Sequence, residues 1–279
     1  MRSTTRQMPA RDGTPLLIRR WSADGEPWAT VVLVHGIAEH SGRYEHVGAW
    51  LAEAGLDVVA YDQRGFGASG GRRAHVDRWQ QVHDDLADRL ADAAAASRGG
   101  PVVLWGHSLG GLIALGYCVA ERPGPMPAAL VLSAPAVDSA TPGWQRFLAR
   151  VLTRVAPTLS VKNAFDGSVL SRDPAVGERY LADPLNQHTT TARFGAEAFA
   201  EQDRVRSALG RLTIPTYVYH GAADRLVPTV TSEPLAALPN VTRRTWPDLR
   251  HETHNEANGR DVIEAAVAWL RSVLQSADN

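Results

Sequence analysis

The segment Gly106-His107-Ser108-Leu109-Gly110 contains the residue types needed for a serine nucleophile. It follows an apolar run at 102–105 and precedes "GLIALGYCVAE", a stretch that favours a helix. In a sharp strand-to-helix turn, the glycines let the backbone fold back while the serine hydroxyl stays accessible. The first helical turn also presents free N–H groups to a developing negative charge. The motif therefore predicts that Ser108 is a nucleophile, with a purely structural turn as the alternative.

A serine hydroxyl attacks well only when a base takes its proton and a third group orients that base. The chain offers candidates in the order serine, acid, histidine. Asp224 follows the apolar run in "YVYHGAADRLVP", and "HETHNE" after the next run contains His251 and His254. The residue types alone leave both histidines as candidates for the base.

The elements that would position these residues alternate along the chain. Continuous apolar runs such as "VVLVH" and "ALVLS" are typical of strands buried on both faces of a parallel sheet. Apolar residues recur every three or four positions in 76–90 and 262–274, which predicts helices with one buried face. This alternation predicts an α/β fold with a mostly parallel, doubly wound sheet. The predicted strands are 16–21, 30–35, 56–61, 101–106, 128–133, 216–220 and 241–246.

One segment interrupts the alternation. Residues 137–212 show no clear buried strand, contain a helix-like stretch at 144–156 and are punctuated by four prolines within 142–184. We interpret this segment as a helical cap inserted between two strands of a core made of residues 1–136 and 213–279. The cap is expected to be an insertion and not an independent domain.

Composition excludes several classes of function. The chain has 279 residues with 29 basic and 30 acidic side chains, which argues against capture of nucleic acid by charge. Its single cysteine permits no intramolecular disulfide, and no His-Glu-x-x-His or cysteine pair suggests a metal site. No apolar run approaches the ~18 residues of a membrane span, and the polar N-terminus does not resemble a secretory signal. We expect a cytoplasmic protein that uses neither a metal nor a cofactor.

Four segments together resemble monoacylglycerol lipases of the α/β-hydrolase superfamily: "HGIAEHSGRY" at 35–44, "YDQRGFGASGG" at 61–71, "GHSLGG" and "HGAADRLVP". The block at 35–44 is the most specific, because most α/β-hydrolases keep only its His-Gly pair. The resemblance spans about residues 14–274 and is loose in the cap. It implies an α/β-hydrolase fold with Ser108 as nucleophile, Asp224 as acid and His251 as base. The block "HETHNE" resembles the family's terminal block with His251 leading, which leaves His254 as a surface or helix-capping histidine.

The resemblance also suggests how the intermediate is stabilised and where the substrate lies. Oxyanion stabilisation needs two preorganised donors, and we expect them to be the backbone N–H groups of Leu109 and Ile37. His35 is expected to brace the loop that carries Ile37 and not to act as a base. The candidate residues for the substrate pocket are His35, Glu39, Trp144, Phe147, Leu148 and Val151.

The leading interpretation is a serine ester hydrolase that cleaves monoacylglycerols, small lipid esters, to glycerol and fatty acid. A lysophospholipase or a broad carboxylesterase with the same triad remains an alternative, because these enzymes differ mainly in pocket shape. A non-catalytic binding protein with this fold is a further alternative. A transient membrane contact through the cap stays open, since the substrate partitions into lipid, and the sequence does not indicate an oligomeric state.

Overall fold

The computed structural model describes residues 2–121, 124–139, 141–162 and 166–275. The strands are β1 (Thr4–Pro9), β2 (Pro15–Trp21), β3 (Ala29–Val34), β4 (Leu56–Tyr61), β5 (Val102–His107), β6 (Ala129–Ser133), β7 (Ser160–Lys162), β8 (Thr189–Thr191), β9 (Thr216–Gly221) and β10 (Val241–Trp246). The α-helices are α1 (Glu45–Glu53), α2 (Gln80–Ala96), α3 (Leu109–Cys118), α4 (Gly143–Val155), α5 (Pro174–Ala182), α6 (Ala192–Ala208) and α7 (Gly259–Leu274). Short 3₁₀ helices are η1 (Ser41–Tyr44), η2 (Gly167–Val169), η3 (Leu209–Arg211), η4 (Thr229–Ala237) and η5 (Thr253–Asn255).

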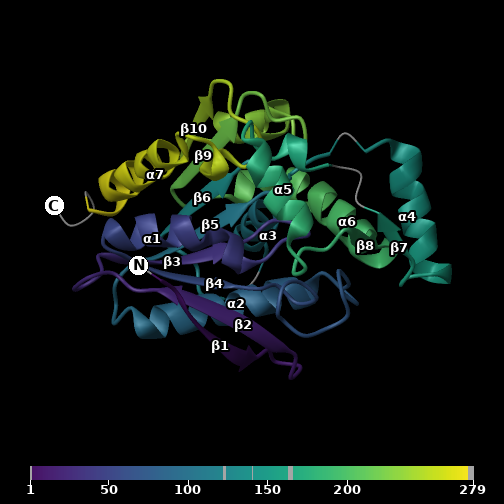
Figure 1. Cartoon of the computed structure of the whole chain (residues 1–279), viewed down its shortest axis with the longest axis horizontal. Helices are drawn as coiled ribbons and strands as arrows, with labels where there is room; N and C mark the ends of the chain where they lie inside the picture. The colour runs from purple at the N-terminus through teal and green to yellow at the C-terminus, as the bar shows by residue number, and fades with distance from the viewer. Residues whose placement is uncertain (1, 122–123, 140, 163–165, 276–279) are drawn as a thin grey trace.

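The main sheet has eight strands in the order β1-β2-β4-β3-β5-β6-β9-β10 (Figure 1). The β1/β2 and β2/β4 pairs are antiparallel, and the strands from β4 to β10 pair in parallel. The predicted mostly parallel sheet is therefore confirmed, and every predicted strand lies within one or two residues of an observed one.

Helices cover both faces of this sheet, as expected for a doubly wound fold. On one face, α2, α3 and α6 pack against alternate strand residues such as Val32, Leu104 and Leu132. On the other face, α1 and α7 pack against the intervening residues, among them Leu33 and Val131. Alternate side chains of each central strand thus enter opposite clusters, which explains why these strands are continuously apolar.

The carboxyl ends of the parallel strands gather the loops that carry the candidate catalytic residues. The loop after β3 contains Ile37, the turn after β5 contains Ser108, and the loops after β9 and β10 contain Asp224 and His251. In an open parallel sheet these ends lie along one edge, which is where ligands bind. Residues distant in the chain are therefore brought to one edge by topology alone.

The cap comprises the elements between β6 and β9, and α4 with β7 and β8 lies at one end of the molecule, away from α7 (Figure 1). None of the residues of α4 is buried, although its apolar pattern resembles that of a core helix. The last cap helix, α6, behaves differently, because Phe194, Val205 and Ala208 join the cluster formed by α2 and α3. The insertion is thus continuous with the core at its C-terminal end.

The edge strand β1 lies outside the elements predicted from the sequence. Its residues are polar and mostly exposed, so they show no apolar alternation. It forms because its backbone pairs with β2 in register from Thr4 opposite Arg20 to Pro9 opposite Pro15. Backbone pairing of this kind leaves little trace in the pattern of side chains.

Candidate active site

Ser108 occupies a strained turn between β5 and α3. Its backbone angles are φ 52° and ψ −115°, in the left-handed half of conformational space that L-residues rarely adopt. Such a conformation costs about 1–3 kcal/mol and persists only where the surroundings impose it. Here the Ser108 N–H donates to the Ser133 carbonyl at 2.9 Å, and the Ser108 carbonyl accepts from the Ala136 N–H at 3.0 Å. The turn therefore has the geometry of a nucleophile elbow.

Both glycines of the motif are required by close backbone approaches. A Cβ on Gly106 would lie 2.3 Å from the Gly110 carbonyl oxygen, and a Cβ on Gly110 would lie 2.1 Å from the Val34 carbonyl oxygen. Contacts this short are repulsive, so any larger residue would push α3 away from the sheet. The Gly-x-Ser-x-Gly spacing is thus explained by packing of the turn.

Asp224 and His251 meet although 27 residues separate them in the chain. The His251 Nδ1–H donates to Asp224 Oδ2 at 2.7 Å, and both side chains are buried. Asp224 Oδ1 accepts the backbone N–H groups of Leu226 at 2.8 Å and Val227 at 2.9 Å. Because Nδ1 of the neutral His251 ring carries the proton that is donated to Asp224, Nε2 is left unprotonated and can accept a proton. Ser108 and His251 line the same small space.

Electrostatics favour a charged acid and a basic histidine. Burial alone would raise the pKa of Asp224, but the facing His251, the His220 side chain and the Val227 N–H hold that pKa well below its usual range. Burial lowers the pKa of His251, yet Asp224, with Glu252 and Glu39 nearby, more than offsets this and raises it. Such opposed shifts are typical of a base oriented by an ionised acid.

The structure separates the two candidate histidines. His254 is also buried, contrary to the expectation of a surface or capping residue, and its ring stacks on Tyr44 with centroids 5.1 Å apart. Burial and the neighbouring His107 hold its pKa well below the ordinary value. Only His251 of the two contacts Asp224 among the described residues. The geometry therefore favours His251 as the base.

The two expected oxyanion donors lie beside Ser108. Leu109 begins α3, where an N–H has no intrahelical acceptor, and Ile37 lies in the loop of residues 35–39, here called the oxyanion loop. Ser108 lines one cavity together with both residues. Among the described residues, neither N–H has a protein acceptor, so both are available to an anion.

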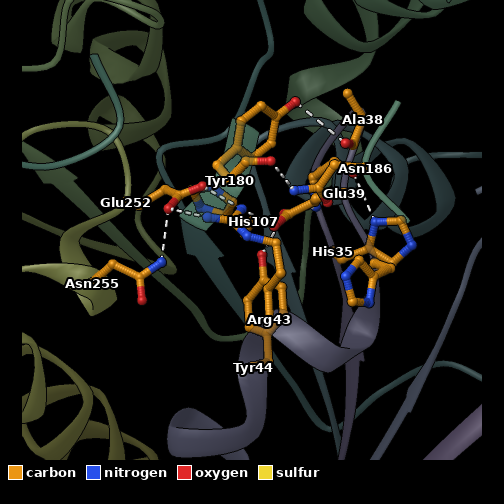
Figure 2. A network of polar contacts seen from close by, with 12 residues as sticks. His35, Ala38, Glu39, Arg43, Tyr44, His107, Tyr180, Asn186, Glu252 and Asn255 are labelled. Carbon is orange, nitrogen blue, oxygen red and sulfur yellow. Dashed lines mark hydrogen bonds and ion pairs between the residues drawn. The ribbon is translucent and has the colours of Figure 1, made fainter. Parts of the chain in front are cut away.

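A buried ionic network fixes the oxyanion loop, as Figure 2 shows. Glu39 Oε1 accepts the Gly36 N–H at 2.5 Å and the Tyr44 hydroxyl at 2.7 Å, while Glu39 Oε2 accepts Arg43 at 2.5 Å. Arg43 continues to Glu252, with bonds of 2.6 and 2.8 Å. Since Glu252 follows His251 in the chain, Arg43 ties the oxyanion loop to the segment that carries the candidate base.

The cap holds the same loop from the opposite side. Ala38 has a left-handed φ of 65°, and its carbonyl accepts the Gln187 N–H at 3.0 Å. The same carbonyl accepts the Tyr180 hydroxyl at 3.3 Å (Figure 2). The His40 Nε2 lies 2.9 Å from Asp183 Oδ2 at the end of α5. The position of the oxyanion loop therefore depends on the cap as well as on the core.

Loss of the guanidinium at position 43 should destabilise the protein strongly. In Arg43→Met, Glu39 and Glu252 remain buried without their cation, and breaking a buried ion pair in this way costs about 3–5 kcal/mol. Because Arg43 holds the pKa of Glu252 below its usual value, its removal lets the carboxylate take up a proton as the pH falls. The deficit in the free energy of unfolding should therefore be largest at pH 8 and smaller at pH 5. Urea denaturation at both pH values measures it.

Arg260→Met is the matched control for this measurement. Arg260 also contacts two glutamates, Glu53 at 3.0 Å and Glu264 at 2.9 Å, but on the surface. Exposed ion pairs contribute little, so this variant should unfold like the wild type. Equal losses for both variants would contradict a special role of the buried network.

A larger, mostly apolar cavity of about 640 Å³ extends from Ser108 under the cap. This volume lies within the usual range for ligand sites. Its walls come from α3, α4, α6 and the loop after β9. The main apolar residues lining it are Ile37, Leu109, Leu112, Trp144, Leu148, Leu152, Phe194, Phe199, Leu226 and Val227.

Only part of the expected substrate pocket lines one of these two spaces. Trp144 and Leu148 line the large cavity, and Glu39 lines the small space beside Ser108. Phe147 is 67% exposed, and neither Phe147 nor Val151 lines either of these spaces. The face of α4 toward the cavity is formed by Trp144, Gln145, Leu148, Ala149 and Leu152. Helical periodicity identified the helix but not which stripe faces inward.

His35 lies behind the oxyanion loop and lines neither of these two spaces. Its Nδ1 is 2.7 Å from the Gly36 carbonyl, and its Nε2 accepts the Gln63 N–H at 2.9 Å. Burial lowers the pKa of His35, consistent with a neutral ring. These contacts support a bracing role for His35, and its place in the substrate pocket stays a prediction.

Sequence reasoning missed the contribution of α6. Phe194, Ala198 and Phe199 line the large cavity from a helix whose apolar residues gave no separate signal. Phe194 and Ala198, and likewise Gly195 and Phe199, are four residues apart, the helical spacing that places each pair on one face. The partner of Arg43 was also missed, because Glu252 lies 209 residues away.

The chain is similar to several characterised hydrolases. The family model described as serine aminopeptidase, S33, matches residues 25–258. A monoacylglycerol lipase of Mycolicibacterium smegmatis is 36% identical over 269 residues, covering 94% of this chain and 95% of that protein. A phospholipase of Bacillus subtilis is 30% identical over 270 residues, covering 89% and 97%. The crystal structure of Paleococcus ferrophilus monoacylglycerol lipase superposes with a TM-score of 0.83 at 32% identity, covering 92% of this chain and 99% of that one.

Proposed function

The chain is a monoacylglycerol lipase-like member of the serine aminopeptidase S33 family of α/β-hydrolases, and from this membership we propose that it cleaves monoacylglycerols to glycerol and fatty acid. The matches establish the family and the α/β-hydrolase fold. They also establish that the chain is a hydrolase of the lipase and esterase kind. The ester that it prefers and the roles of individual residues are the proposal. The observation that carries it is the large, mostly apolar cavity that Ser108 lines together with Ile37 and Leu109.

The proposed chemistry proceeds through an acyl-enzyme. Ser108 Oγ attacks the ester carbonyl while His251 Nε2 takes the hydroxyl proton, and Asp224 stabilises the resulting imidazolium. The carbonyl oxygen, now negative, accepts the N–H groups of Ile37 and Leu109. The C–O bond to glycerol then breaks, and His251 returns its proton to the departing alkoxide.

Hydrolysis of the acyl-enzyme repeats these steps with water. His251 removes a proton from the water as its oxygen attacks the Ser108 ester. A second oxyanion forms at the same two N–H groups, and the proton passes to Ser108 as the fatty acid leaves. The reaction consists only of acyl and proton transfers, with no redox step. Ser108, His251 and Asp224 suffice for the proton transfers.

The large cavity suits an acyl chain. Each methylene transferred from water into an apolar site contributes about 0.8 kcal/mol, so walls such as Leu112, Phe194 and Phe199 favour medium or long chains over acetate. Because Ser108 lines this cavity together with Ile37 and Leu109, the carbonyl carbon of a bound chain would meet Oγ.

The small space beside Ser108 has a volume of only about 10 Å³, room for about one water molecule, so the alcohol part of a substrate would enter it only after its walls move apart. Its polar walls include Glu39, Arg43, Tyr180 and Glu252, which carry one more negative than positive charge when ionised. Hydroxyl groups can donate to carboxylates, whereas the phosphate of a lysophospholipid would face two of them. This charge balance supports glycerol over a phosphate-containing head group, although a relative is named a phospholipase.

A comparison of esters with one acyl chain tests the proposal. We expect kcat/KM for a monoacylglycerol to exceed that for the lysophosphatidylcholine of the same chain by at least about tenfold, since each 1.4 kcal/mol of repulsion costs this factor. Released fatty acid would be measured for both, with Ser108→Ala as background. A preference for the lysophospholipid would indicate a phospholipase. Turnover of short aryl esters without that of any monoacylglycerol would indicate a general esterase.

We also propose that the cap touches lipid surfaces transiently. None of the described helices is long and apolar enough to cross a membrane. The cap nevertheless exposes large apolar side chains next to the exposed Arg150 and Arg154, a combination found in helices that lie on membranes. These side chains are Trp144, Phe147, Leu148, Val155, Leu159 and Val161. Three of them, Trp144, Leu148 and Val161, also line the large cavity, so this face would let a lipid ester pass from a bilayer into it.

A further inference from the structure

His220 is a completely buried histidine that the proposed mechanism does not use. It lies near the end of β9, four residues before Asp224, in the segment His-Gly-Ala-Ala-Asp. A buried imidazole is retained only where its two nitrogens find partners. Those partners connect His220 directly to the acid of the candidate triad.

The protonation of His220 follows from its neighbours. Its Nε2 is 3.1 Å from Asp224 Oδ2 and 2.7 Å from the Val227 carbonyl oxygen. Both neighbours can only accept, because Asp224 is ionised, so Nε2 must carry a proton. Its Nδ1 is 3.0 Å from Ser232 Oγ, which can either donate or accept.

The chain of contacts continues to the next strand. Arg243 on β10 donates its Nε–H to Ser232 Oγ at 3.1 Å and a terminal N–H to the Thr229 carbonyl at 2.8 Å. Ser232 is itself completely buried. The ring of His220 is therefore fixed from both sides and cannot rotate away from Asp224 without breaking this network.

Asp224 Oδ2 is consequently shared between two imidazoles. His251 Nδ1 reaches it at 2.7 Å and His220 Nε2 at 3.1 Å, while Oδ1 accepts two backbone N–H groups. A carboxylate with two donors on one oxygen offers each of them less negative charge than it would offer alone. His251 therefore receives only part of the attraction that Asp224 could exert.

We propose that His220 is a positioning residue. Its Nε2–H holds the Asp224 carboxylate in place and weakens the attraction between Asp224 and the Nδ1–H of His251. The role rests on the proposed function, in which His251 must be neutral to accept the Ser108 proton. Without the second donor, Asp224 would stabilise the imidazolium more strongly. His251 would then remain protonated, and unable to act as a base, up to a higher pH.

Other charged groups around the pair act on wild type and variants alike. His251 faces His107 from β5, with ring centroids 4.8 Å apart, and lies near Glu252 and Glu39, which raise its pKa. Arg43 pairs with both of these glutamates and offsets one of their two charges, and Arg243 approaches His220 through Ser232. Of these groups, only His220 and His251 bind the Asp224 carboxylate, so a substitution at 220 isolates the shared oxygen.

Two substitutions with side chains of similar length separate the effect of the hydrogen-bond donor at position 220 from the effect of side-chain volume. His220→Gln keeps an N–H that can reach Asp224, whereas His220→Met fills the space without a donor. In His220→Met we expect the acidic limb of the kcat/KM profile to move up by about 0.5–1 pH unit, about half of the roughly 1–2 units that a whole hydrogen bond to a charge would give, because the lost bond acts on His251 only through Asp224. In His220→Gln the limb should stay near that of the wild type.

The sign of the shift distinguishes this role from a merely structural one. A loosened fold would lower kcat/KM at all pH values, whereas the proposed role concentrates the loss below pH 7 and lets it shrink as the pH rises. Rates would be divided by the active sites that react with a fluorophosphonate, so partial unfolding does not distort them. An unshifted limb in His220→Met, or an equal shift in both variants, would overturn the proposal.

A second measurement does not depend on turnover. The imidazole of His251 can be titrated by NMR in Ser108→Ala and in Ser108→Ala combined with His220→Met. The pKa of His251 should be higher in the double variant. If the wild type hydrolysed no ester, the proposed function would fail, yet this titration would still decide whether His220 tunes His251.

Discussion

Replacement of Ser108 with alanine is expected to lower kcat/KM for ester hydrolysis by about 10⁴- to 10⁶-fold. The substitution removes only Oγ, so the strained turn, the cavity and the N–H groups of Ile37 and Leu109 remain. What is lost is the covalent route, since no other hydroxyl in the described residues occupies the elbow. Initial rates with a monoacylglycerol and with an aryl ester measure the loss.

Covalent labelling gives an independent readout of the same residue. A fluorophosphonate should attach one phosphonyl group to the wild type at Ser108 and none to Ser108→Ala, which mass spectrometry of the peptides would detect. Ser207→Ala is a matched control, because Ser207 is exposed on α6 and donates only to the Arg204 carbonyl. Unchanged hydrolysis by Ser108→Ala would show that the assignment of the nucleophile is wrong and would reopen the possibility of a binding protein.

Replacement of His251 with alanine should lower kcat/KM by a similar factor, whereas His254→Ala should retain turnover within about tenfold of the wild type. His251 is the histidine that donates to Asp224 at 2.7 Å. His254 stacks on Tyr44 and approaches His107 at 5.0 Å between ring centroids, so its loss should mainly reduce stability. Turnover should therefore be expressed per folded molecule, with the folded fraction obtained from circular dichroism.

The pair of histidine variants also has an outcome that would contradict the assignment. If His254→Ala lost turnover as completely as His251→Ala while remaining folded, His254 would have to take part in proton transfer. Its low pKa and its lack of contact with Asp224 argue against this. Burst kinetics with an aryl ester would show which step, acylation or deacylation, each substitution slows.

The parts of the fold that sequence predicted are those with strong local signals. The central strands were recognisable because burial on both faces makes them continuously apolar, and α7 because one stripe of it enters the core. The motif around Ser108 was recognisable because three residue types at fixed spacing meet a steric demand at Gly106 and Gly110. In each case the cause lies within one element and its immediate neighbours.

The features that the sequence did not predict depend on which part of the folded chain packs against each element. The helix α4 has the apolar pattern of a core helix, but it lies against α6, the cavity and solvent, so Phe147 is exposed and Leu152 faces the cavity. The burial of His254 was missed because the short segment around it has no periodicity, and stacking on Tyr44 cannot be read from either residue alone. Strand β1 was missed because backbone pairing holds it.

The bridge from Arg43 to Glu252 has a consequence for the order in which the protein folds. Its two ends are separated by 209 residues, so closing it requires most of the chain to be in place first. Until the segment after β10 docks, Glu39 and Arg43 lack Glu252, and Ser108 lacks His251. The ability to transfer an acyl group would therefore appear late in folding, together with the packing of α7. A partly folded chain would not yet have an activated Ser108.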